Sequence, residues 1–489
     1  MTIPMEPTID TKLAALADAV LIPPFTGTTP PPWILAALER GLAGVTLFGS
    51  NVTGDIASLT GTLRSAAGTD PVIAIDEEGG DVTRVAYVQG SPYPGNAVLG
   101  VVDDVTLTRD VYAAIGADLI RLGINVDLAP CADVLAVGGT VVVGTRSFGM
   151  DPALVARHVA AAVSGLQGAG VAACAKHFPG HGSTAADSHL TLATISGTLA
   201  EIRARDLPPF QAAVAAGTWT LMPGHLRVPE LTGDLPATLS PAAISGLLRG
   251  ELGYDGVVIC DALEMKAASA VYGIPEAAVL AILAGTDLLC LGRDTDEAMY
   301  HAVRAALADA VNSGRLATGR LEEAAERVAG LRARLSQARR DYVAPAGARH
   351  DGVGVAAARR ALRASGRIPA RLDNAVVIEV EPEENIAAGR FTWGFSPWTT
   401  VRRVEPTAGN GASAAALVRE ATGRPLVLAV RDALGVLPFV SDVLAARPDA
   451  IIVEMGVPSW SPPEGTAYLA TYGASRACAQ AAAEALGFA

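Results

Sequence analysis

Residues Ala175–His189 read AKHFPGHGSTAADSH and follow directly on the apolar run Val171–Cys174. This short segment holds three of the seven histidines of the chain, together with a lysine, an aspartate, a proline and two glycines. The apolar run has the length and composition of a buried strand, whereas proline and glycine so close together exclude a regular helix. The stretch therefore predicts a strand that ends in an irregular loop bearing polar side chains, an arrangement in which a rigid scaffold positions functional groups.

Four kinds of site compete for this loop. A metal site would use His177, His181, Asp187 and His189, but their spacing matches neither a helical HExxH motif nor a CxxC pair. A phosphate-binding loop would require the order GxxxxGK[ST], and GHGST lacks its lysine. A plain turn whose histidines bond to the backbone is the third possibility. Asp187 and His189 favour the fourth, a tuned acid/base, since a carboxylate one residue away can orient an imidazole and stabilise its protonated form.

The sequence KHFPGHG at 176–182, followed by DSH at 187–189, resembles the signature of the β-N-acetylglucosaminidase branch of glycoside hydrolase family 3. The glucosidase branch does not share the full motif, so the match indicates the branch as well as the family. The resemblance implies that His189 is the general acid/base and that Asp187 assists it. It also implies that Lys176 and His177 hold the sugar.

Length, charge and cysteine content limit the class of protein. The chain of 489 residues is too long for one ordinary core, which predicts two domains, one of them a large barrel. Half of the residues are hydrophobic and 18% are charged, so sizeable buried cores are expected. The net charge of −13 argues against nucleic acid as a partner, because its binding requires a basic surface. The five cysteines are odd in number and lie mostly in apolar runs, which indicates buried thiols in a reducing compartment.

The sequence contains no pattern typical of secretion or of a membrane span. Residues 1–24 carry acids, lack a basic region and break a short apolar run at Pro23-Pro24, unlike a secretory signal. Elsewhere no stretch of eighteen residues stays apolar without a charge or a Gly/Pro break. We therefore expect a cytoplasmic protein with no membrane partner, and a lipid anchor or non-classical export is the alternative.

The first two thirds of the chain alternate short apolar runs with amphipathic helical segments. Asp151-Pro152 and Gly168 are typical bounds of one helix, Ser240-Pro241 begins another, and Pro275 and Gly285 bound a third. Seven or eight such repeats predict a parallel sheet closed into a TIM-type (β/α)8 barrel. The predicted strands are Gly44–Phe48, Val72–Ile75, Ile124–Leu128, Val171–Lys176, Thr218–Met222, Val257–Cys260 and Leu288–Leu291.

Polar residues stand where several of these strands end. The first of them is Asp76, the next are Lys176 and His177, and His225 and Asp261 follow two later strands. The functional groups of such barrels lie at the carboxyl ends of the strands. A doubly wound open sheet would also place groups there, but with fewer repeats and with a phosphate-binding fingerprint, which the sequence lacks.

Asp261 follows a wholly apolar strand in the run VVICDALEM at 257–265. A carboxylate at such a position commonly caps the following turn, so spacing alone assigns it no chemical role. Hydrolysis with retention needs a carboxylate nucleophile opposite an acid/base, and the run resembles the nucleophile segment of the family, which implies that Asp261 is the nucleophile. Glu264, one turn further on, is the competing carboxylate and ranks below Asp261.

Two further stretches extend the resemblance to sugar ligands. IDEEGGDVTR at 75–84 is similar to the acidic sugar-binding strand end of the family, which implies that Asp76 accepts hydrogen bonds from sugar hydroxyls and that Arg84 reaches the same subsite. Many members carry arginine where this chain has Asp81. GTRSFG at 144–149 is similar to the arginine loop of the family and implies Arg146 as another sugar ligand. Without the resemblance both stretches would be interpreted as surface turns.

Three more polar residues fit the same region. Asp127 and Asp133, in NVDLAPCADV at 125–134, match the family pattern and are interpreted as structural supports near the barrel mouth. His225, in MPGH at 222–225, either lies behind the site or belongs to a sugar subsite. No pattern in the sequence calls for a metal ion or an organic cofactor.

The sequence beyond the barrel predicts a second domain. The barrel is expected to cover residues 1–341 and to end with the charged helix Arg320–Arg340, and a linker with one helix is expected over 342–371. Residues 372–489 are expected to form a smaller α/β sandwich domain that buttresses the barrel or shapes its outer subsites. Its predicted strands are Ala375–Val380, Pro425–Val430, Ala450–Glu454 and Ala467–Thr471.

Together these parts predict a retaining β-N-acetylglucosaminidase that acts on a small carbohydrate, either a cell-wall turnover fragment or a chito-oligosaccharide. Asp261 would attack the anomeric carbon while protonated His189 donates to the departing oxygen, and neutral His189 would then activate the acceptor. An imidazole does not repel an anionic acceptor as a carboxylate does, so a phosphorylase that uses phosphate in place of water is the alternative. A sugar-binding barrel without catalysis is the remaining possibility, and the presence of both Asp261 and His189 opposes it.

Overall fold

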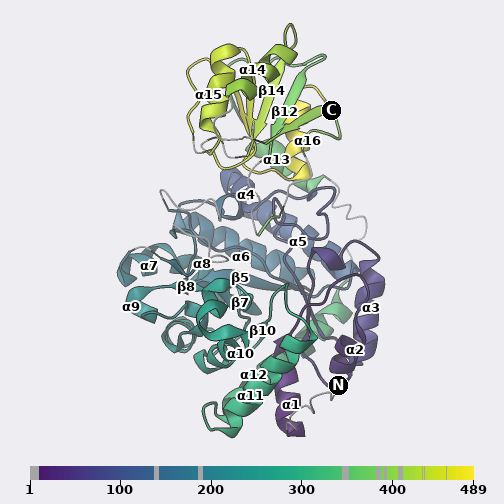
Figure 1. Ribbon diagram of the computed structural model, residues 1–489, viewed down its shortest axis with the longest axis vertical. Helices are drawn as coiled ribbons and strands as arrows, with labels where there is room; N and C mark the ends of the chain where they lie inside the picture. The colour runs from purple at the N-terminus through teal and green to yellow at the C-terminus, as the bar shows by residue number, and fades with distance from the viewer. Residues whose placement is uncertain are drawn as a thin grey trace. The chain divides into compact units, whose positions relative to one another are not determined.

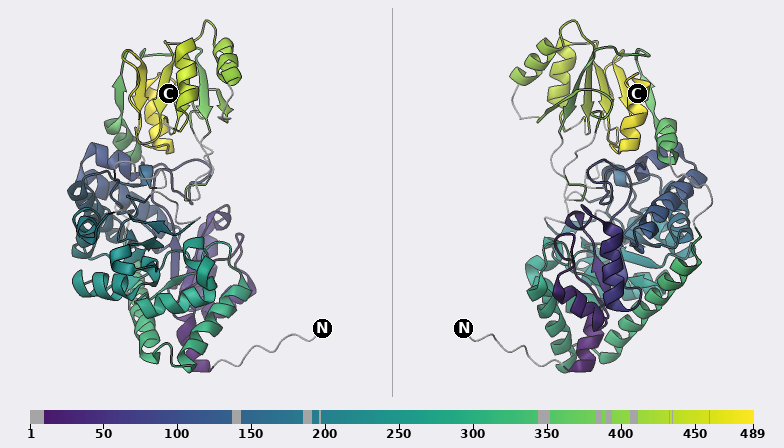
Figure 2. Two further views of the ribbon diagram at one scale, coloured as in Figure 1. Left: turned by 60° about the vertical axis from the view of Figure 1, so that its left-hand side comes forward. Right: turned by 90° about the vertical axis from the view of Figure 1, so that its right-hand side faces the viewer.

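The computed structural model describes residues 10–136, 143–184, 191–195, 197–343, 352–381, 387–389, 394–405, 411–431, 433, 435–458 and 460–489. The chain forms two compact units, which Figures 1 and 2 show coloured along the sequence. The barrel unit consists of Met1–Glu77, Tyr112–Thr140 and Met150–Ala348. The C-terminal unit consists of Glu78–Val111, Val141–Gly149 and Arg349–Ala489.

The sheet of the barrel unit is built from short parallel strands that are buried on both faces. Six of them pair in the order β2-β3-β4-β5-β7-β9. Their bounds are β2 (Gly44–Thr46), β3 (Val72–Ile75), β4 (Val126–Asp127), β5 (Ala172–Phe178), β7 (Thr220–Pro223) and β9 (Val257–Val258). Because both faces are covered, the strands lie in mainly apolar runs rather than alternating ones, which is why the sequence indicated them. Polar residues such as Asp127, Lys176 and His177 stand at or near the strand ends.

Two more strands close this sheet into a ring. β1 (Leu21–Ile22) pairs in parallel with β10 (Leu289–Cys290). A bridge between Ile259 and Leu288 joins β9 to β10, and the amide of Thr46 donates to the carbonyl of Pro23 at 3.3 Å, which joins β2 to the end of β1. The predicted TIM-type barrel is therefore confirmed. All seven predicted barrel strands overlap strands of the ring, whereas β1 was not predicted because it is two residues long and two prolines follow it.

Helices cover the outside of this ring (Figure 1). Asp151 caps one of them by accepting the amide of Ala153, and Pro152 occupies its first position, so the predicted bounds of that helix are confirmed. The helices are α1 (Thr11–Asp18), α2 (Pro32–Glu39), α3 (Ile56–Ala67), α5 (Val105–Arg121, which begins in the C-terminal unit), α6 (Pro152–Gly168), α7 (Leu199–Arg205), α8 (Leu207–Ala215), α9 (Pro229–Thr232), α10 (Lys266–Ala284), α11 (Glu297–Asn312) and α12 (Thr318–Asp341). A π-helix, η4, covers Ala242–Glu251 and follows the predicted start at Ser240-Pro241.

Helix α10 begins earlier than the sequence predicted. It consists of two helical pieces joined at Gly273, whose φ of 72° and ψ of 159° are not helical. The predicted start at Pro275 and the end before Gly285 belong to the second piece. In the described part of the chain, α10 is the one helix with the length and hydropathy that a membrane span needs, and 44% of that window is buried inside the protein. The Gly/Pro break expected from the sequence thus lies within this helix.

The C-terminal unit has its own sheet, with strand order β11-β16-β15-β14-β12-β13. β11 (Arg363–Ser365) runs antiparallel to β16, and the other neighbours are parallel. The remaining strands are β12 (Val376–Val380), β13 (Val401–Val404), β14 (Leu426–Val430), β15 (Ile451–Glu454) and β16 (Ala467–Ala470). The four predicted strands match β12, β14, β15 and β16, whereas the exposed edge strands β11 and β13 lack the apolar character that would have indicated them.

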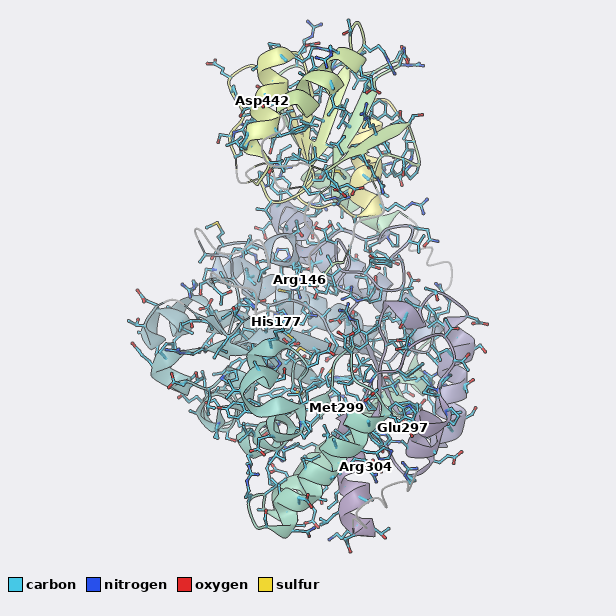
Figure 3. All side chains as sticks on the ribbon, in the orientation of Figure 1. Arg146, His177, Glu297, Met299, Arg304 and Asp442 are labelled. Carbon is cyan, nitrogen blue, oxygen red and sulfur yellow. The ribbon has the colours of Figure 1, made fainter. Side chains whose placement is uncertain are left out.

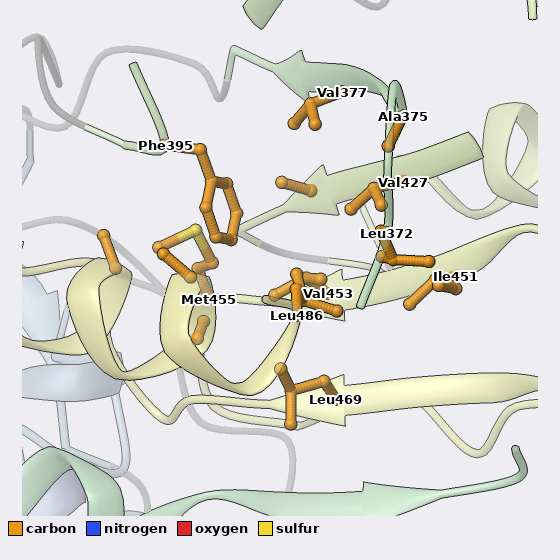
Figure 4. Packing of buried hydrophobic residues seen from close by; sticks show 14 of the residues in the cluster. Leu372, Ala375, Val377, Phe395, Val427, Ile451, Val453, Met455, Leu469 and Leu486 are labelled. Atoms are coloured by element: carbon orange, nitrogen blue, oxygen red, sulfur yellow. The ribbon is translucent and has the colours of Figure 1, made fainter. Parts of the chain in front are cut away.

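Helices lie on both faces of this sheet, as predicted for an α/β sandwich. The helices of this unit are α4 (Asn96–Val102), α13 (Val353–Ala361), α14 (Gly411–Glu420), α15 (Leu437–Ala446) and α16 (Arg476–Ala485), with the short 3-10 helix η2 at Gly144–Arg146. On one face, Phe395, Met455 and Leu486 pack together over Val427 and Val453 (Figure 4). The other face is buried by residues of α14 and α15. The unit therefore holds a core of its own.

Two segments that the sequence had assigned to the barrel, 78–111 and 141–149, belong to the C-terminal unit. Val98 of α4 packs with Ala358 and Ala361 of α13 and with Ala477 of α16. Helix α13 is the helix expected within 342–371. The proposed limits of the domains along the sequence, 1–341, 342–371 and 372–489, stay a prediction. All five cysteines are buried free thiols, as expected.

Candidate active site

The predicted site residues of the barrel unit lie where its strands end. Asp76 follows β3 directly, and Asp261 comes three residues after β9. Lys176 and His177 are the fifth and sixth residues of β5, because this strand extends to Phe178, two residues beyond its predicted end. Figure 3 shows His177 among the side chains of the barrel unit. The strand thus carries these two side chains before the loop begins, at a point where its register to β7 shifts.

Lys176 and Asp76 form an ion pair. Nζ of Lys176 lies 2.7 Å from Oδ1 of Asp76, and their side chains are 3% and 20% exposed. A buried ammonium group requires a partner of opposite charge because its desolvation is costly. The pair joins two strands that are separated by β4, and it fixes the carboxylate of Asp76 while leaving part of its surface accessible.

Asp133 gathers four donors from the segments around it. Its Oδ1 accepts the backbone N–H groups of His177 (3.2 Å) and His181 (2.7 Å). Its Oδ2 lies 2.8 Å from Nδ1 of His177 and accepts the thiol of Cys131 at 3.1 Å. Burial alone would raise the pKa of Asp133, but the neighbouring imidazole of His177 and these hydrogen bonds outweigh burial and lower the pKa to about 2.

The loop after β5 is also braced within itself. Oγ1 of Thr184 lies 2.6 Å from Nδ1 of His181 and donates to the carbonyl of the same residue at 3.0 Å. The rings of His177 and His181 meet edge to face, with their centroids 5.8 Å apart. The amide of Ala136 donates to the carbonyl of Gly182 at 3.1 Å. The histidines of the motif are therefore held in one orientation by their own neighbours.

Cys131, Asp133 and His177 offer ligand atoms that lie within 4.8 Å of one another. Such a group has the residue types of a metal site. Hydrogen bonds account for this closeness, since the thiol and the imidazole both bond to the carboxylate of Asp133. We therefore interpret the group as a hydrogen-bonded support for His177.

Asp127 supports the strand end that carries Asp76. Its Oδ1 accepts the amide of Glu77 at 3.0 Å, and its Oδ2 has no hydrogen-bond partner in the described part of the chain. Burial raises the pKa of Asp127 well above the usual range for a carboxyl group, against the hydrogen bond from Glu77. Asp127 and Asp133 thus both serve as supports, in agreement with the interpretation from the sequence.

The two carboxylates after β9 have different surroundings. Asp261 is partly exposed, and its Oδ1 accepts the amide of Ala262 at 2.8 Å, as a residue that caps a turn does. Glu264 accepts the backbone amides of Arg293, at 2.5 Å, and Asp294. Burial raises the pKa of Glu264 despite these hydrogen bonds. Glu264 is also partly exposed, but its two oxygens hold the loop after β10, so the structure favours Asp261 as the reactive carboxylate.

His225 lies next to this segment. Its Nε2 is 2.9 Å from the carbonyl of Ala262, and the residue is completely buried. The imidazole thus links the end of β7 to the residue that follows Asp261. Of the two roles left open for His225, this contact favours a position behind the site.

The predicted acid/base pair, Asp187 and His189, falls in 185–190, outside the described residues. The described segment that leads to it ends at Ser183 and Thr184. The roles of Asp187 and His189 therefore stay predictions. What the structure adds is the geometry of the segment that precedes them.

Arg84 and Arg146, the other predicted sugar ligands, belong to the C-terminal unit. Arg146, labelled in Figure 3, forms a buried bidentate ion pair with Glu78, with Nε–Oε2 of 2.9 Å and Nη2–Oε1 of 2.7 Å. Nη2 of Arg84 donates to the carbonyl of Ala387 at 2.8 Å. The sequence did not indicate Glu78 as a partner. The sugar-binding roles of both arginines stay predictions.

Asp81, at the position where many relatives carry arginine, has a structural role in the C-terminal unit. Its Oδ2 accepts the hydroxyl of Thr145 at 2.7 Å, and its Oδ1 accepts the amide of Ala474 at 2.9 Å. The carboxylate therefore joins the segments 78–111 and 141–149 to the turn before α16. An arginine could not accept either hydrogen bond.

Two further residues lie near the loop after β5, although they belong to no sequence motif and were not predicted. Arg205 and Asp206 lie where α7 meets α8, and Nη2 of Arg205 donates to Oγ of Ser183 at 2.8 Å. In the sequence, an arginine and an aspartate between two helical segments resemble an ordinary helix boundary. The signal that could have indicated them is Gly180, because a glycine in a rigid loop often marks a close approach.

Comparison with known proteins agrees with this geometry. The family model described as "Glycosyl hydrolase family 3 N terminal domain" matches residues 37–331. Among curated relatives, a beta-hexosaminidase A of Pseudoalteromonas piscicida is 34% identical over 338 residues, which cover 63% of this chain and 56% of the relative. Beta-hexosaminidase LpqI of Mycobacterium tuberculosis is 37% identical over 299 residues, which cover 59% of this chain and 75% of the relative.

Solved structures resemble the chain over nearly its whole length. A glycoside hydrolase family 3 β-N-acetylglucosaminidase from a Paenibacillus species has a TM-score of 0.85 and 30% identity, covering 97% of this chain and 96% of its own. A β-glucoside phosphorylase has a TM-score of 0.73 at 19% identity and shares the fold. The fold and the motif-bearing loop therefore point to the same family.

Proposed function

The chain belongs to glycoside hydrolase family 3, and we propose that it is a retaining β-N-acetylglucosaminidase. The main support for this proposal is the loop after β5. Asp133 accepts hydrogen bonds from the KHFPGHG motif, and Lys176 of the same motif forms an ion pair with Asp76. The relatives named beta-hexosaminidase and the β-N-acetylglucosaminidase of similar structure support this proposal. The first of these relatives is longer than the part that the chain matches, so its whole activity is not transferred.

In the proposed mechanism, Asp261 attacks the anomeric carbon and forms a covalent glycosyl-enzyme. Its partial exposure at the end of β9 supports this role, and the engagement of Glu264 by two backbone amides removes the competing carboxylate. His189 donates a proton to the departing oxygen and then takes one from the acceptor, with Asp187 orienting its ring. This acid/base pair comes from the resemblance of the motif.

The sugar is proposed to lie against the ends of β3 and β5. Asp76 keeps an accessible surface while Lys176 holds it in place, so it can accept hydrogen bonds from sugar hydroxyls. Asp133 holds the imidazole of His177 through Nδ1, which fixes the orientation of its ring. Arg84 and Arg146 are proposed as further sugar ligands, as the resemblance implies.

The proposed substrates are small β-N-acetylglucosaminides, either cell-wall turnover fragments or chito-oligosaccharides. We further propose a cytoplasmic location, which the five buried free thiols support. Fractionation of cells that express the tagged full chain tests the location. Recovery with the membrane or outside the cell would contradict it.

The test of the activity is product analysis by mass spectrometry. The purified protein is incubated with a nitrophenyl β-N-acetylglucosaminide in buffers with and without inorganic phosphate. We expect free N-acetylglucosamine at the same rate in both. N-acetylglucosamine 1-phosphate formed faster with phosphate would establish the phosphorylase alternative, and no product in either buffer would favour the sugar-binding barrel without catalysis.

Two variants test the roles of the residues. Asp261→Asn removes the nucleophile, so turnover of every substrate should cease. His189→Ala should spare substrates whose leaving group needs no proton, because the nucleophile is intact. Full activity in both variants would contradict the assignment.

A further inference from the structure

The carboxylate of Asp206 is committed to a neighbouring arginine. Asp206 directly precedes α8, but its side chain caps no N–H group of the first helical turn, because the second and third helical residues, Pro208 and Pro209, have no N–H to donate. The carboxylate is fully buried and binds the adjacent guanidinium, with 2.7 Å between Oδ2 and Nη2 of Arg205 and 3.1 Å between Oδ1 and its Nε. A capping role is thus closed to Asp206, and its carboxylate serves Arg205.

Arg205 in turn reaches the loop after β5. The same Nη2 donates to Oγ of Ser183 at 2.8 Å, although the two residues belong to different elements. The guanidinium side chain is 27% exposed, and its ion pair with the buried Asp206 holds it against the protein. Ser183 lies four residues before Asp187. The planar, multidentate guanidinium therefore fixes the start of the segment that leads to the acid/base pair.

The loop also passes directly over Asp206. Gly180 has a φ of +133°, and a Cβ added there would lie 2.6 Å from Cβ of Asp206. On the opposite side of the loop, a Cβ added at Gly182 would lie 1.9 Å from the carbonyl oxygen of Val134. The segment between these glycines is therefore enclosed from both sides, and Arg205 provides the hydrogen bond at its far end.

We infer that Arg205 and Asp206 are positioning residues for acid/base catalysis, with Arg205 holding Ser183 and Asp206 holding Arg205. This inference rests on the proposed function and adds two residues that no motif contains. Acid/base catalysis depends on placing an imidazole within hydrogen-bond reach of the glycosidic oxygen, and a displacement of one ångström in a loop is costly. Attack by Asp261 on the anomeric carbon does not depend on this anchor. Loss of Arg205 should therefore affect protonation of the leaving group selectively.

The experiment compares Arg205→Gln with a matched control, Arg203→Gln. Arg203 lies on the same helix and pairs with Glu251 at 2.7 Å, but this pair is about half exposed and does not touch the loop. The value of kcat/KM, which reports formation of the glycosyl-enzyme, is measured on dinitrophenyl and phenyl β-N-acetylglucosaminides. Dinitrophenolate departs without a proton, whereas phenolate departs far more slowly unless it is protonated.

We expect Arg205→Gln to lose about 30-fold or more on the phenyl substrate, within the range that general acid catalysis contributes, and less than about 3-fold on the dinitrophenyl substrate. Arg203→Gln should match the unmodified protein on both. Equal losses on the two substrates, or no loss beyond that of the control, would overturn the inference.

A milder variant guards against failure of Arg205→Gln to fold. Ser183→Ala removes only the hydroxyl that Arg205 contacts, and it should show the same selectivity with a smaller, several-fold loss on the phenyl substrate. If Ser183→Ala and the unmodified protein have the same ratio of kcat/KM for the two substrates, the contact between Arg205 and Ser183 does not position the acid/base pair, and the inference is wrong. An unmodified protein that cleaves neither substrate would overturn the proposed function itself, which distinguishes that failure from the failure of the anchor.

Discussion

Two buried aspartates hold the loop after β5, and they differ in their partners and in their pKa values. Asp133 bonds directly to the loop, whereas Asp206 acts through the guanidinium of Arg205. Burial would raise the pKa of both carboxyl groups. The pKa of Asp133 is nevertheless lowered to about 2, while that of Asp206 is raised by burial to about 6 against the effect of Arg205, and the charge of Asp133 raises it further.

The difference shows that the number and kind of partners, not the degree of burial, decide what a buried carboxylate does. Both side chains have no exposed surface. Asp133 has four donors for two oxygens, and its low pKa keeps it ionised at neutral and mildly acidic pH. Asp206 has one cationic partner and can change its charge near neutral pH. We call Asp133 the permanent anchor of the loop, because its charge does not change near neutral pH. We call Asp206 the adjustable anchor, because its charge can change there.

The largest effect is expected from removing the permanent anchor. Asp133→Ala leaves two backbone amides, an imidazole and a thiol without their acceptor, and the loss of a buried, hydrogen-bonded charge costs about 3–5 kcal/mol. We expect loss of activity and a lower free energy of unfolding, measured by urea denaturation. Asp133→Asn is the control, because its amide oxygen still accepts from one side and should retain part of the stability. Equal stability of the alanine variant and the unmodified protein would show that the loop does not need this anchor.

The next effect concerns the space beside the loop. A Cβ at Gly182 would lie 1.9 Å from the carbonyl oxygen of Val134, a backbone atom that cannot rotate away. Gly182→Ala should therefore displace the loop, with a loss of about 1–3 kcal/mol and a fall in kcat. Gly61→Ala is the matched control, since no atom lies within 4 Å of the added methyl group in helix α3. There alanine should stabilise by about 0.5–1 kcal/mol; a Gly182 variant that behaves like it would contradict the close approach.

The adjustable anchor predicts an effect of pH on stability. The unfolded chain loses the proton of Asp206 near pH 4 and the folded chain near pH 6, so stability falls as pH rises through this window, by about 3 kcal/mol. For Asp133 the sign is opposite, because its folded pKa of about 2 gives stability that is lost as pH falls from about 4 to 2.

Asp206→Asn should abolish the fall in stability between pH 4 and pH 6. The measurement is urea denaturation of this variant and of the unmodified protein at several pH values, from which the difference in free energy is taken. Asp110→Asn, whose side chain is 52% exposed, is the control for the loss of a carboxylate elsewhere. If the difference between Asp206→Asn and the unmodified protein stays constant across the window, Asp206 does not titrate within it.

Asp133 and Asp206 also show which parts of the site could be predicted from the sequence. Asp133 was predicted as a support because it stands in a motif-like stretch after a predicted strand. That it would hold both His177 and His181 depends on how two strand ends meet, which no local pattern encodes. Asp206 was missed because its partner Arg205 meets Ser183, a residue distant in the sequence, only in the folded protein. The sequence around Asp206 is typical of a helix boundary.

The fold followed from the sequence more completely than the site did. β3 is a continuous apolar run, and β5 begins with one, because parallel strands are buried on both faces, so composition indicated both. Edge strands such as β13 are exposed and carry no such signal. The assignment of Arg84 and Arg146 to the C-terminal unit was also not predicted, because it results from packing between distant segments.

The smallest expected effect tests which donors matter to Asp133. Cys131 gives the weakest of its four hydrogen bonds, since a thiol is a poor donor, and its Sγ lies 3.1 Å from Oδ2. Cys131→Ala should therefore cost about 1 kcal/mol or less from this bond, plus a small cavity, and leave kcat unchanged. His177→Ala, in contrast, removes an imidazole that lies 2.8 Å from the same oxygen and should lower both stability and turnover. A large loss of activity in Cys131→Ala would mean that the thiol, and not the imidazole and the backbone amides, keeps Asp133 in place.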